Sequence, residues 1–87
     1  MTRILPLGEF ASLAVGTGNS TTVDNATVVR VLSNAGAAVV VRTDNAGTVI
    51  GSFTSVSGTA DLVEKNASDK IYVTGNAVEV SKVGFTN

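Results

Sequence analysis

The residues of this chain that could take part in acid–base chemistry are its carboxylates, because histidine and cysteine are both absent. Without imidazole or thiol groups, the chain lacks the residues of a Ser/His or Cys-based catalytic apparatus, of a disulfide and of the common zinc sites. Six acidic residues lie in separate predicted strands and turns, namely Asp24, Asp44, Asp61, Glu64, Asp69 and Glu79. Solvated carboxylates at strand edges are the ordinary interpretation of this spread. We therefore assign no catalytic residue and expect that the protein is not an enzyme.

Two short motifs invite a ligand-binding interpretation. Gly16-Thr17-Gly18-Asn19 has the glycine content of a phosphate-binding loop. It lacks the following Lys-Ser/Thr, a third glycine and a predicted helix, so a flexible loop is the better interpretation. Calcium is the one metal that the ligand inventory leaves open, but Asp44-Asn45 offers too few oxygen ligands for a calcium loop. We assign no cofactor-binding and no metal-binding residue.

Composition and charge narrow the classes of partner. Charged residues make up 15% of the 87 residues, the net charge is −1 and the mean hydropathy is +0.33. This composition argues against intrinsic disorder and against a nucleic-acid partner held by electrostatics. The uncharged run over residues 10–23 is too short and too rich in Gly, Ser and Thr to cross a membrane. Pro6, Gly8 and Glu9 interrupt any signal-peptide core, so we expect no membrane partner and a chain that is not secreted.

The elements that must position these residues are predicted to be β-strands. The chain contains fifteen valines and eleven threonines, and β-branched residues suit a pleated surface. Strong β runs occur at residues 27–32, 37–43, 48–56, 60–64, 70–74 and 77–83. No segment has the 3.6-residue apolar period of an amphipathic helix. We predict an all-β fold: a single compact antiparallel β-sandwich or small β-barrel of six to seven short strands.

Turn residues separate these runs. Glycine or asparagine, which adopt positive φ at little cost, stands between each pair of predicted strands. The turns are predicted at Asn34-Ala35-Gly36, Asn45-Ala46-Gly47, Ser57-Gly58, Asn66-Ala67-Ser68-Asp69 and Gly75-Asn76. Each is interpreted as a hairpin or a tight corner, which favours a meander of short strands.

The alternation within each run predicts which side chains form the core. Ile71, Val73, Val78 and Val80 are predicted to point inward, with Glu79 outward, and Phe53 and Phe85 are also assigned to the core. Arg30 and Arg42 are taken to mark the wetter face of their strands. In the run 60–64, either Leu62 with Ala60 or Val63 with Asp61 faces the core. Several strands carry apolar residues on both faces, which is typical of a doubly covered sheet or of a face that binds another subunit.

The N-terminal segment has a weaker pattern than the rest. Residues 1–20 contain Pro6 and several Gly and Ser residues between Gly8 and Gly18, so we expect an arm or long loop that is ordered mainly by contact with a partner. The alternative is a strand that begins at Ile4 and Leu5. The β-sandwich domain is then expected over residues 21–87. A chain of this size buries only about 63% of its surface on folding, so association with other subunits would stabilise it.

Five tracts of this chain resemble small virion proteins of tailed bacteriophages, particularly those of marine cyanobacteria. The tracts are Thr27-Val28-Val29-Arg30-Val31, Gly47-Thr48-Val49-Ile50-Gly51-Ser52-Phe53, Leu62-Val63-Glu64-Lys65, Ser68-Asp69-Lys70-Ile71-Tyr72 and Lys82-Val83-Gly84-Phe85-Thr86-Asn87. The resemblance covers about the last 60 residues and leaves out residues 1–20. It implies a compact β-sandwich with a structural role, either as a decoration (cement) protein on the outside of the capsid or as a small part of the neck, tail or fibre.

The resemblance also implies where the protein acts and with what. We expect a capsid decoration protein that is made in the host cytoplasm and located in the virion, on the capsid surface. Its expected partners are the major capsid protein or other virion proteins, and we expect it to be a homo-oligomer or to occupy a lattice in multiple copies. The alternative from another class is a free carbohydrate- or peptide-binding β-module, since β-sandwiches often bind ligands in their end loops.

Overall fold

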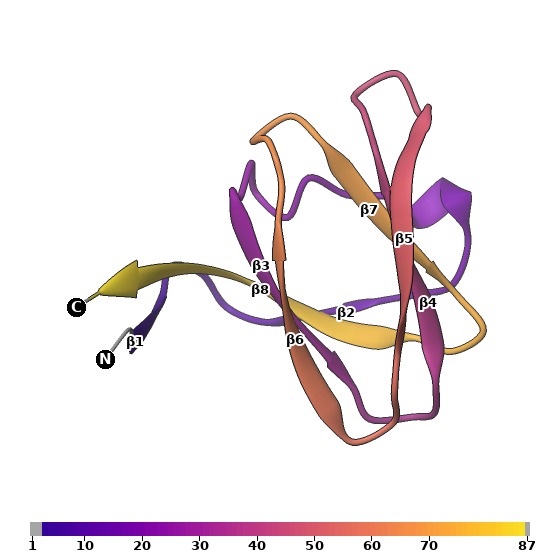
Figure 1. Ribbon diagram of the computed structural model, residues 1–87, viewed down its shortest axis with the longest axis horizontal. Helices are drawn as coiled ribbons and strands as arrows, with labels where there is room; N and C mark the ends of the chain where they lie inside the picture. Colours follow the sequence, from indigo (N-terminus) through magenta and orange to yellow (C-terminus); the bar gives the residue numbers. More distant parts are fainter. Residues whose placement is uncertain (1–2, 87) are drawn as a thin grey trace.

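The computed structural model describes the backbone of residues 3–86 and the side chains of residues 5–84. Eight strands and one short 3-10 helix lie in this part of the chain, which contains no α-helix (Figure 1). The elements are β1 Arg3–Pro6, β2 Ala11–Leu13, η1 Thr17–Asn19, β3 Val28–Ser33, β4 Ala38–Thr43, β5 Val49–Ser55, β6 Thr59–Glu64, β7 Lys70–Thr74 and β8 Val78–Thr86. The all-β prediction is confirmed, but the described residues contain eight strands where six to seven were expected, because β1 and β2 come from the segment expected to be an arm.

The strands form two antiparallel sheets. The larger sheet has the order β1-β8-β3-β6, with β2 also paired to β8, and the smaller sheet has the order β5-β4-β7. Along one side of the molecule, backbone hydrogen bonds join Gly16 to Val73 and Thr21 to Ile71, so the segment after β2 covers the outer edge of β7. On the other side, the edge strands β5 and β6 share no ladder. The arrangement is a small sandwich that is closed at β7 and open between β5 and β6.

The predicted turns place successive strands in alternate sheets. The chain changes sheets between β3 and β4, between β5 and β6, between β6 and β7, and between β7 and β8, whereas β4 and β5 form a hairpin within the smaller sheet. Gly36, Gly47, Gly58 and Gly75 all have positive φ. At Gly36 and Gly75 an added Cβ would also meet Asn76 and the Ala37 carbonyl. These glycines are therefore required by the tight corners that the sequence predicted.

The core lies between the two sheets and consists of short aliphatic side chains. Its fully buried members include Val29, Val31, Val40, Ile71, Val73 and Val78, joined by Val80 and Leu13. The prediction that Ile71, Val73, Val78 and Val80 are core residues is confirmed. In β6 the partly buried Val63 packs against the core, whereas Leu62 is exposed. The alternative with Val63 and Asp61 facing inward is the one that the structure has.

The N-terminal segment differs from the arm or loop that we expected. β1 and β2 both pair with β8, in the registers Pro6 to Val83 and Leu13 to Val78. Leu13 is buried in the core. These strands have only four and three residues, so their alternation is too short to detect, and their partner lies far along the chain. Met1 and Thr2 of the expected arm lie outside the described residues.

One face assignment and one core assignment were wrong. Arg42 shares the inner face of β4 with the buried Val40, and its guanidinium lies at the end of the sandwich, where it meets Asp69. The charge therefore did not mark the wetter face. Phe53 also shares the inner face with its neighbour Val40, yet it is 37% exposed because β5 is an open edge. The predicted core position of Phe85 concerns a side chain outside the described ones.

Candidate functional site

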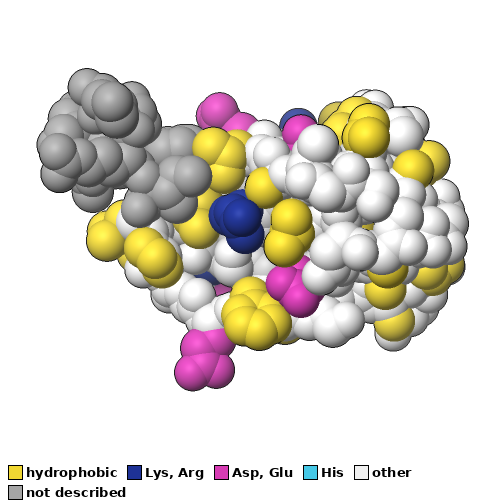
Figure 2. Space-filling view, turned by 90° about the horizontal axis from the view of Figure 1, so that it is seen from below, with side chains coloured by type: hydrophobic (Ala, Val, Ile, Leu, Met, Phe, Trp, Pro, Cys, Tyr) yellow, Lys and Arg dark blue, Asp and Glu magenta, His cyan; other side chains and the backbone are white. Residues whose placement is uncertain are grey.

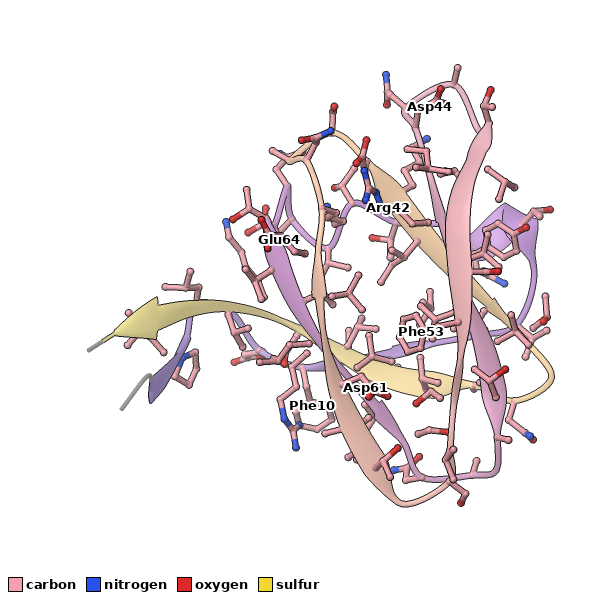
Figure 3. The ribbon with its side chains drawn as sticks, viewed as in Figure 1. Phe10, Arg42, Asp44, Phe53, Asp61 and Glu64 are labelled. Carbon is pink, nitrogen blue, oxygen red and sulfur yellow. The ribbon has the colours of Figure 1, made fainter. Side chains whose placement is uncertain are left out.

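The densest group of charges lies at one end of the sandwich, around the loop between β6 and β7 (Figure 3). The Arg42 Nε donates to Asp69 Oδ2 at 3.0 Å, and the Asn66 amide donates to the same oxygen at 3.0 Å. The Lys65 Nζ donates to the carbonyls of Asn66 and Ala67, at 3.3 and 3.4 Å. Both Lys65 and Asp69 are buried.

Electrostatics in this cluster favour a structural role. Burial lowers the pKa of the Lys65 ammonium from its ordinary value of 10.5, the charge of Asp69 opposes that shift, and the charge of Arg42 adds to it. The basic groups are matched by Asp69 and by Glu64, which lines the same hollow. Every hydrogen-bonding atom buried in the described side chains has a partner. The ion pair of Arg42 with Asp69 and the hydrogen bonds of Asp69 and Lys65 to the backbone fix the loop, which is a structural role.

The other acidic residues are held apart by the fold. Asp44 accepts hydrogen bonds from the amides of Ala46 and Thr48, both at 2.9 Å, and so shapes the β4–β5 turn. Asp61 on β6 accepts from the Ser55 hydroxyl at 3.0 Å, across the open side of the sandwich. Glu79 on β8 accepts from Asn34 at 3.3 Å. Within residues 3–86, no group of three or more acidic residues has the geometry of a metal site.

The glycine-containing segment that invited a phosphate-binding interpretation forms η1. Gly16 adopts a φ of 116°, and the amides of Asn19 and Ser20 bond back to the carbonyls of Gly16 and Thr17. The Asn19 side chain donates to the Val15 carbonyl at 3.0 Å. A single 3-10 turn that is not followed by an α-helix lacks the aligned helix N-terminus of a phosphate-binding loop.

A strained turn follows η1 and was not predicted from the sequence. Val23, Asp24 and Asn25 all have φ near +55°, a region that non-glycine residues seldom adopt. The Thr21 and Thr22 hydroxyls accept hydrogen bonds from the Val23 and Asn25 amides, at 3.0 and 3.1 Å. The Lys82 ammonium donates to the Asp24 carbonyl at 3.1 Å. These bonds hold the turn against β8, beside a pocket that Lys82 and Glu9 also line.

The outer face of the larger sheet carries a shallow apolar groove, which we call the Phe10 groove. It has a volume of about 430 Å³ and is lined by Pro6, Gly8, Phe10, Arg30, Ser81 and Val83. Phe10 is 68% exposed, and Leu62, whose backbone pairs with Arg30, is 46% exposed. Figure 2 shows hydrophobic side chains gathered around a basic one on this side of the molecule. An exposed aromatic ring beside a groove is typical of a protein-binding surface.

A second apolar surface follows the free edge of the smaller sheet, which we call the β5 edge. Its large exposed side chains are Val49, Ile50, Phe53 and Val56. Ser55, at the end of the strand, is the one residue of β5 that is buried. The sequence indicated that some strands had two apolar faces but did not show which strand was left open, because that depends on sheet order.

Comparison with protein-family models, with curated proteins and with solved structures finds no match for this chain. Its function therefore has to be argued from its own surfaces. None of the described helical segments is long and apolar enough to cross a membrane.

Proposed function

We propose that this protein is a structural component of a phage virion that binds other virion proteins through apolar contacts, as a capsid decoration (cement) protein does. In this proposal it sits on the outer capsid surface and stabilises the shell without catalysis. Its partners are the major capsid protein or neighbouring virion proteins, and it is present in many copies. The observation that carries the proposal is the Phe10 groove, an apolar surface on a molecule whose densest charge cluster is internally neutralised.

The chemistry of this surface favours a protein partner. The Phe10 ring and the Leu62 side chain offer apolar area, and Arg30 offers a cation within the same groove. Aromatic residues and arginine are enriched in the central parts of protein interfaces. A weak contact of this size becomes firm when it is repeated over a lattice, because each added contact acts at a high effective concentration. Binding of this kind should depend little on salt.

A second candidate is a free carbohydrate- or peptide-binding module. The observation that favours it is the same exposed Phe10 ring, because an aromatic face beside a groove also suits a sugar ring or an extended peptide. A location in the neck, tail or fibre is the third arrangement and uses the same surface on a different virion protein.

Copy number in purified virions separates these possibilities. Quantitative mass spectrometry should find many copies for a decoration protein, a few for a neck or tail component and none for a free binding module. The Phe10→Ala variant should fold and should bind less to particles that lack the protein. Val15→Ala is the matched control, because Val15 is also exposed but lies outside the Phe10 groove. Absence of the protein from virions would refute the proposal. Equal binding by both variants would show that the Phe10 groove is not the surface that binds the particle.

A further inference from the structure

We infer that the β5 edge pairs with the same strand of a second copy, in an antiparallel register centred on Ser52, so that two smaller sheets join into one sheet of six strands. This inference rests on the edge itself and does not depend on the proposed function. The partner in this pairing is a second copy of the protein. The β5 edge belongs to the smaller sheet, whereas the Phe10 groove lies on the larger sheet.

The β5 edge lacks the features that usually keep edge strands apart. No charged residue and no proline occurs between Asp44 and Asp61, a stretch that contains the whole strand. Natural edge strands are commonly protected by charges, proline or a covering segment. The neighbouring edge strand β6 carries Asp61 and Glu64, and the outer edge of β7 is covered by the segment after β2. Among the edges of the smaller sheet, β5 is therefore the open one.

The uncharged edge also suits a copy of itself better than it suits a charged partner. In a symmetric pair the same strand supplies both sides of the contact, so a strand that carries one sign of charge near the two-fold axis would meet like charges. β5 presents only apolar, hydroxyl and glycine residues for this contact. Ile50 is 49% exposed and Phe53 is 37% exposed, so both have apolar surface left to bury.

Gly51 is the second feature of β5 that supports pairing with another copy. Its φ lies outside the positive range that favours glycine, and a Cβ added there would have no atom within 4 Å. Neither a positive φ nor crowding therefore requires a glycine at this position beside the bulge at Ile50, and glycine weakens a strand. Glycine in a strand often marks a place where another group approaches closely, and an aromatic ring from a neighbouring strand is a known way to cover it. The open space at Gly51 fits such a ring.

The register follows from the faces of the strand. Gly51 and Phe53 pair with Arg42 and Val40 of β4, so they lie on the same, inner face. An antiparallel pair centred on Ser52 places Phe53 of one copy opposite Gly51 of the other. The same register places Ile50 opposite Thr54, so an exposed apolar side chain gains a β-branched neighbour. The bulge at Ile50 interrupts the ladder to β4 between Arg42 and Thr43, so the pairing is limited to about residues 50–54.

Cross-linking through a single thiol tests this register, because the protein has no cysteine of its own. In the Ser52→Cys variant the two thiols lie directly opposite one another, at the Cα separation of about 4.5–5.5 Å that a disulfide accepts. In Thr54→Cys, the matched control on the same strand, the two thiols are four positions apart, or about 13 Å. Under mild oxidation Ser52→Cys should form covalent dimer about tenfold or more faster than Thr54→Cys, given this limit on disulfide geometry.

Sedimentation of the unmodified protein over a wide concentration range provides the second readout. It should show a reversible monomer–dimer equilibrium. Ser52→Lys places two like charges across the symmetry axis and should weaken the dimer about tenfold, since like charges opposite one another destabilise a strand pair. Ala60→Lys adds the same charge at an exposed position of β6 and should leave the dimer unchanged.

Three results would overturn the inference. The protein could remain monomeric at every concentration, which would leave the edge to an extended peptide of another protein. Thr54→Cys could cross-link as fast as Ser52→Cys, which would contradict the register. Ser52→Lys could dimerise as well as Ala60→Lys, which would place the interface elsewhere. None of these results changes the copy number in virions, so the inference and the proposed function fail separately.

Discussion

Replacing Asp69 with alanine tests whether the charged cluster holds the β6–β7 loop. The substitution removes two hydrogen bonds to Asp69 Oδ2, one from the Arg42 Nε and one from the Asn66 amide, both at 3.0 Å. It also removes the anion whose charge favours the ammonium form of Lys65, a buried residue. Each of these losses destabilises the folded state.

The expected loss can be estimated from these contacts. Removing one partner of a buried ion pair costs about 3–5 kcal/mol of stability. The Arg42 side chain is one-third exposed, so water compensates for part of its loss. We therefore expect the free energy of unfolding to fall by about 2–4 kcal/mol. For a domain of this size, a loss of about 3 kcal/mol lowers Tm by roughly 12–24 °C.

Urea unfolding followed by far-UV circular dichroism measures this loss, because the chain has no tryptophan for fluorescence. Asp44→Ala is the matched control, since Asp44 also accepts two hydrogen bonds, both from backbone amides, but belongs to no ion pair in the described residues. It should cost about 1 kcal/mol. In Lys65→Met the further loss caused by Asp69→Ala should shrink, because the buried cation is gone. Equal losses in Asp69→Ala and Asp44→Ala would refute the argument.

Three further predictions concern Lys65, Leu13 and Asp24. Because burial lowers the pKa of Lys65 in the folded state, the unfolded chain binds more protons just below pH 10.5, and the free energy of unfolding should rise with pH in that window. Denaturant titrations across this range should show the rise lost in Lys65→Met and kept in Lys70→Met, which alters a lysine outside the cluster. Leu13→Ala should cost about 2–5 kcal/mol because Leu13 is a core residue, whereas deletion of residues 1–7 should leave a folded domain. A Leu13→Ala variant that is as stable as the natural chain in a thermal melt would show that β2 does not contribute to the core. Asp24→Gly should raise the free energy of unfolding by about 0.5–1 kcal/mol, because glycine relieves the left-handed backbone at Asp24. An unchanged or lower urea midpoint would show that the turn carries little strain.

The strands from β3 to β8 were predictable because they are rich in β-branched residues and are separated by glycine or asparagine turns. Positive φ at Gly36, Gly47, Gly58 and Gly75 is a local requirement, so local sequence identifies it. The alternation also identified Ile71 and Val73 as core residues, since neighbouring positions of a strand point to opposite faces.

The predictions that were wrong concern residues whose positions depend on contacts with distant parts of the chain. Leu13 is buried because β2 pairs with Val78–Val80 of β8, and three residues are too few to show a pattern. Arg42 points inward because Asp69 meets it from the β6–β7 loop, 27 positions further along the chain. Sheet order also decides the two candidate surfaces, because it sets which strand is an edge. The sequence alone therefore did not predict that Phe10 would lie exposed at a groove or that Phe53 would lie exposed at a sheet edge.

The nine-residue strand β8 has a consequence for the order in which this protein can fold. It pairs with β1, β2 and β3, all of which precede it by most of the chain (Figure 1). During synthesis these three strands leave the ribosome well before their shared partner exists. Folds dominated by such distant pairings form slowly, and their unpaired strand edges stay exposed in the meantime. The larger sheet can therefore close only after translation has passed β8, and a nascent chain that stalls earlier presents open β-edges to its surroundings.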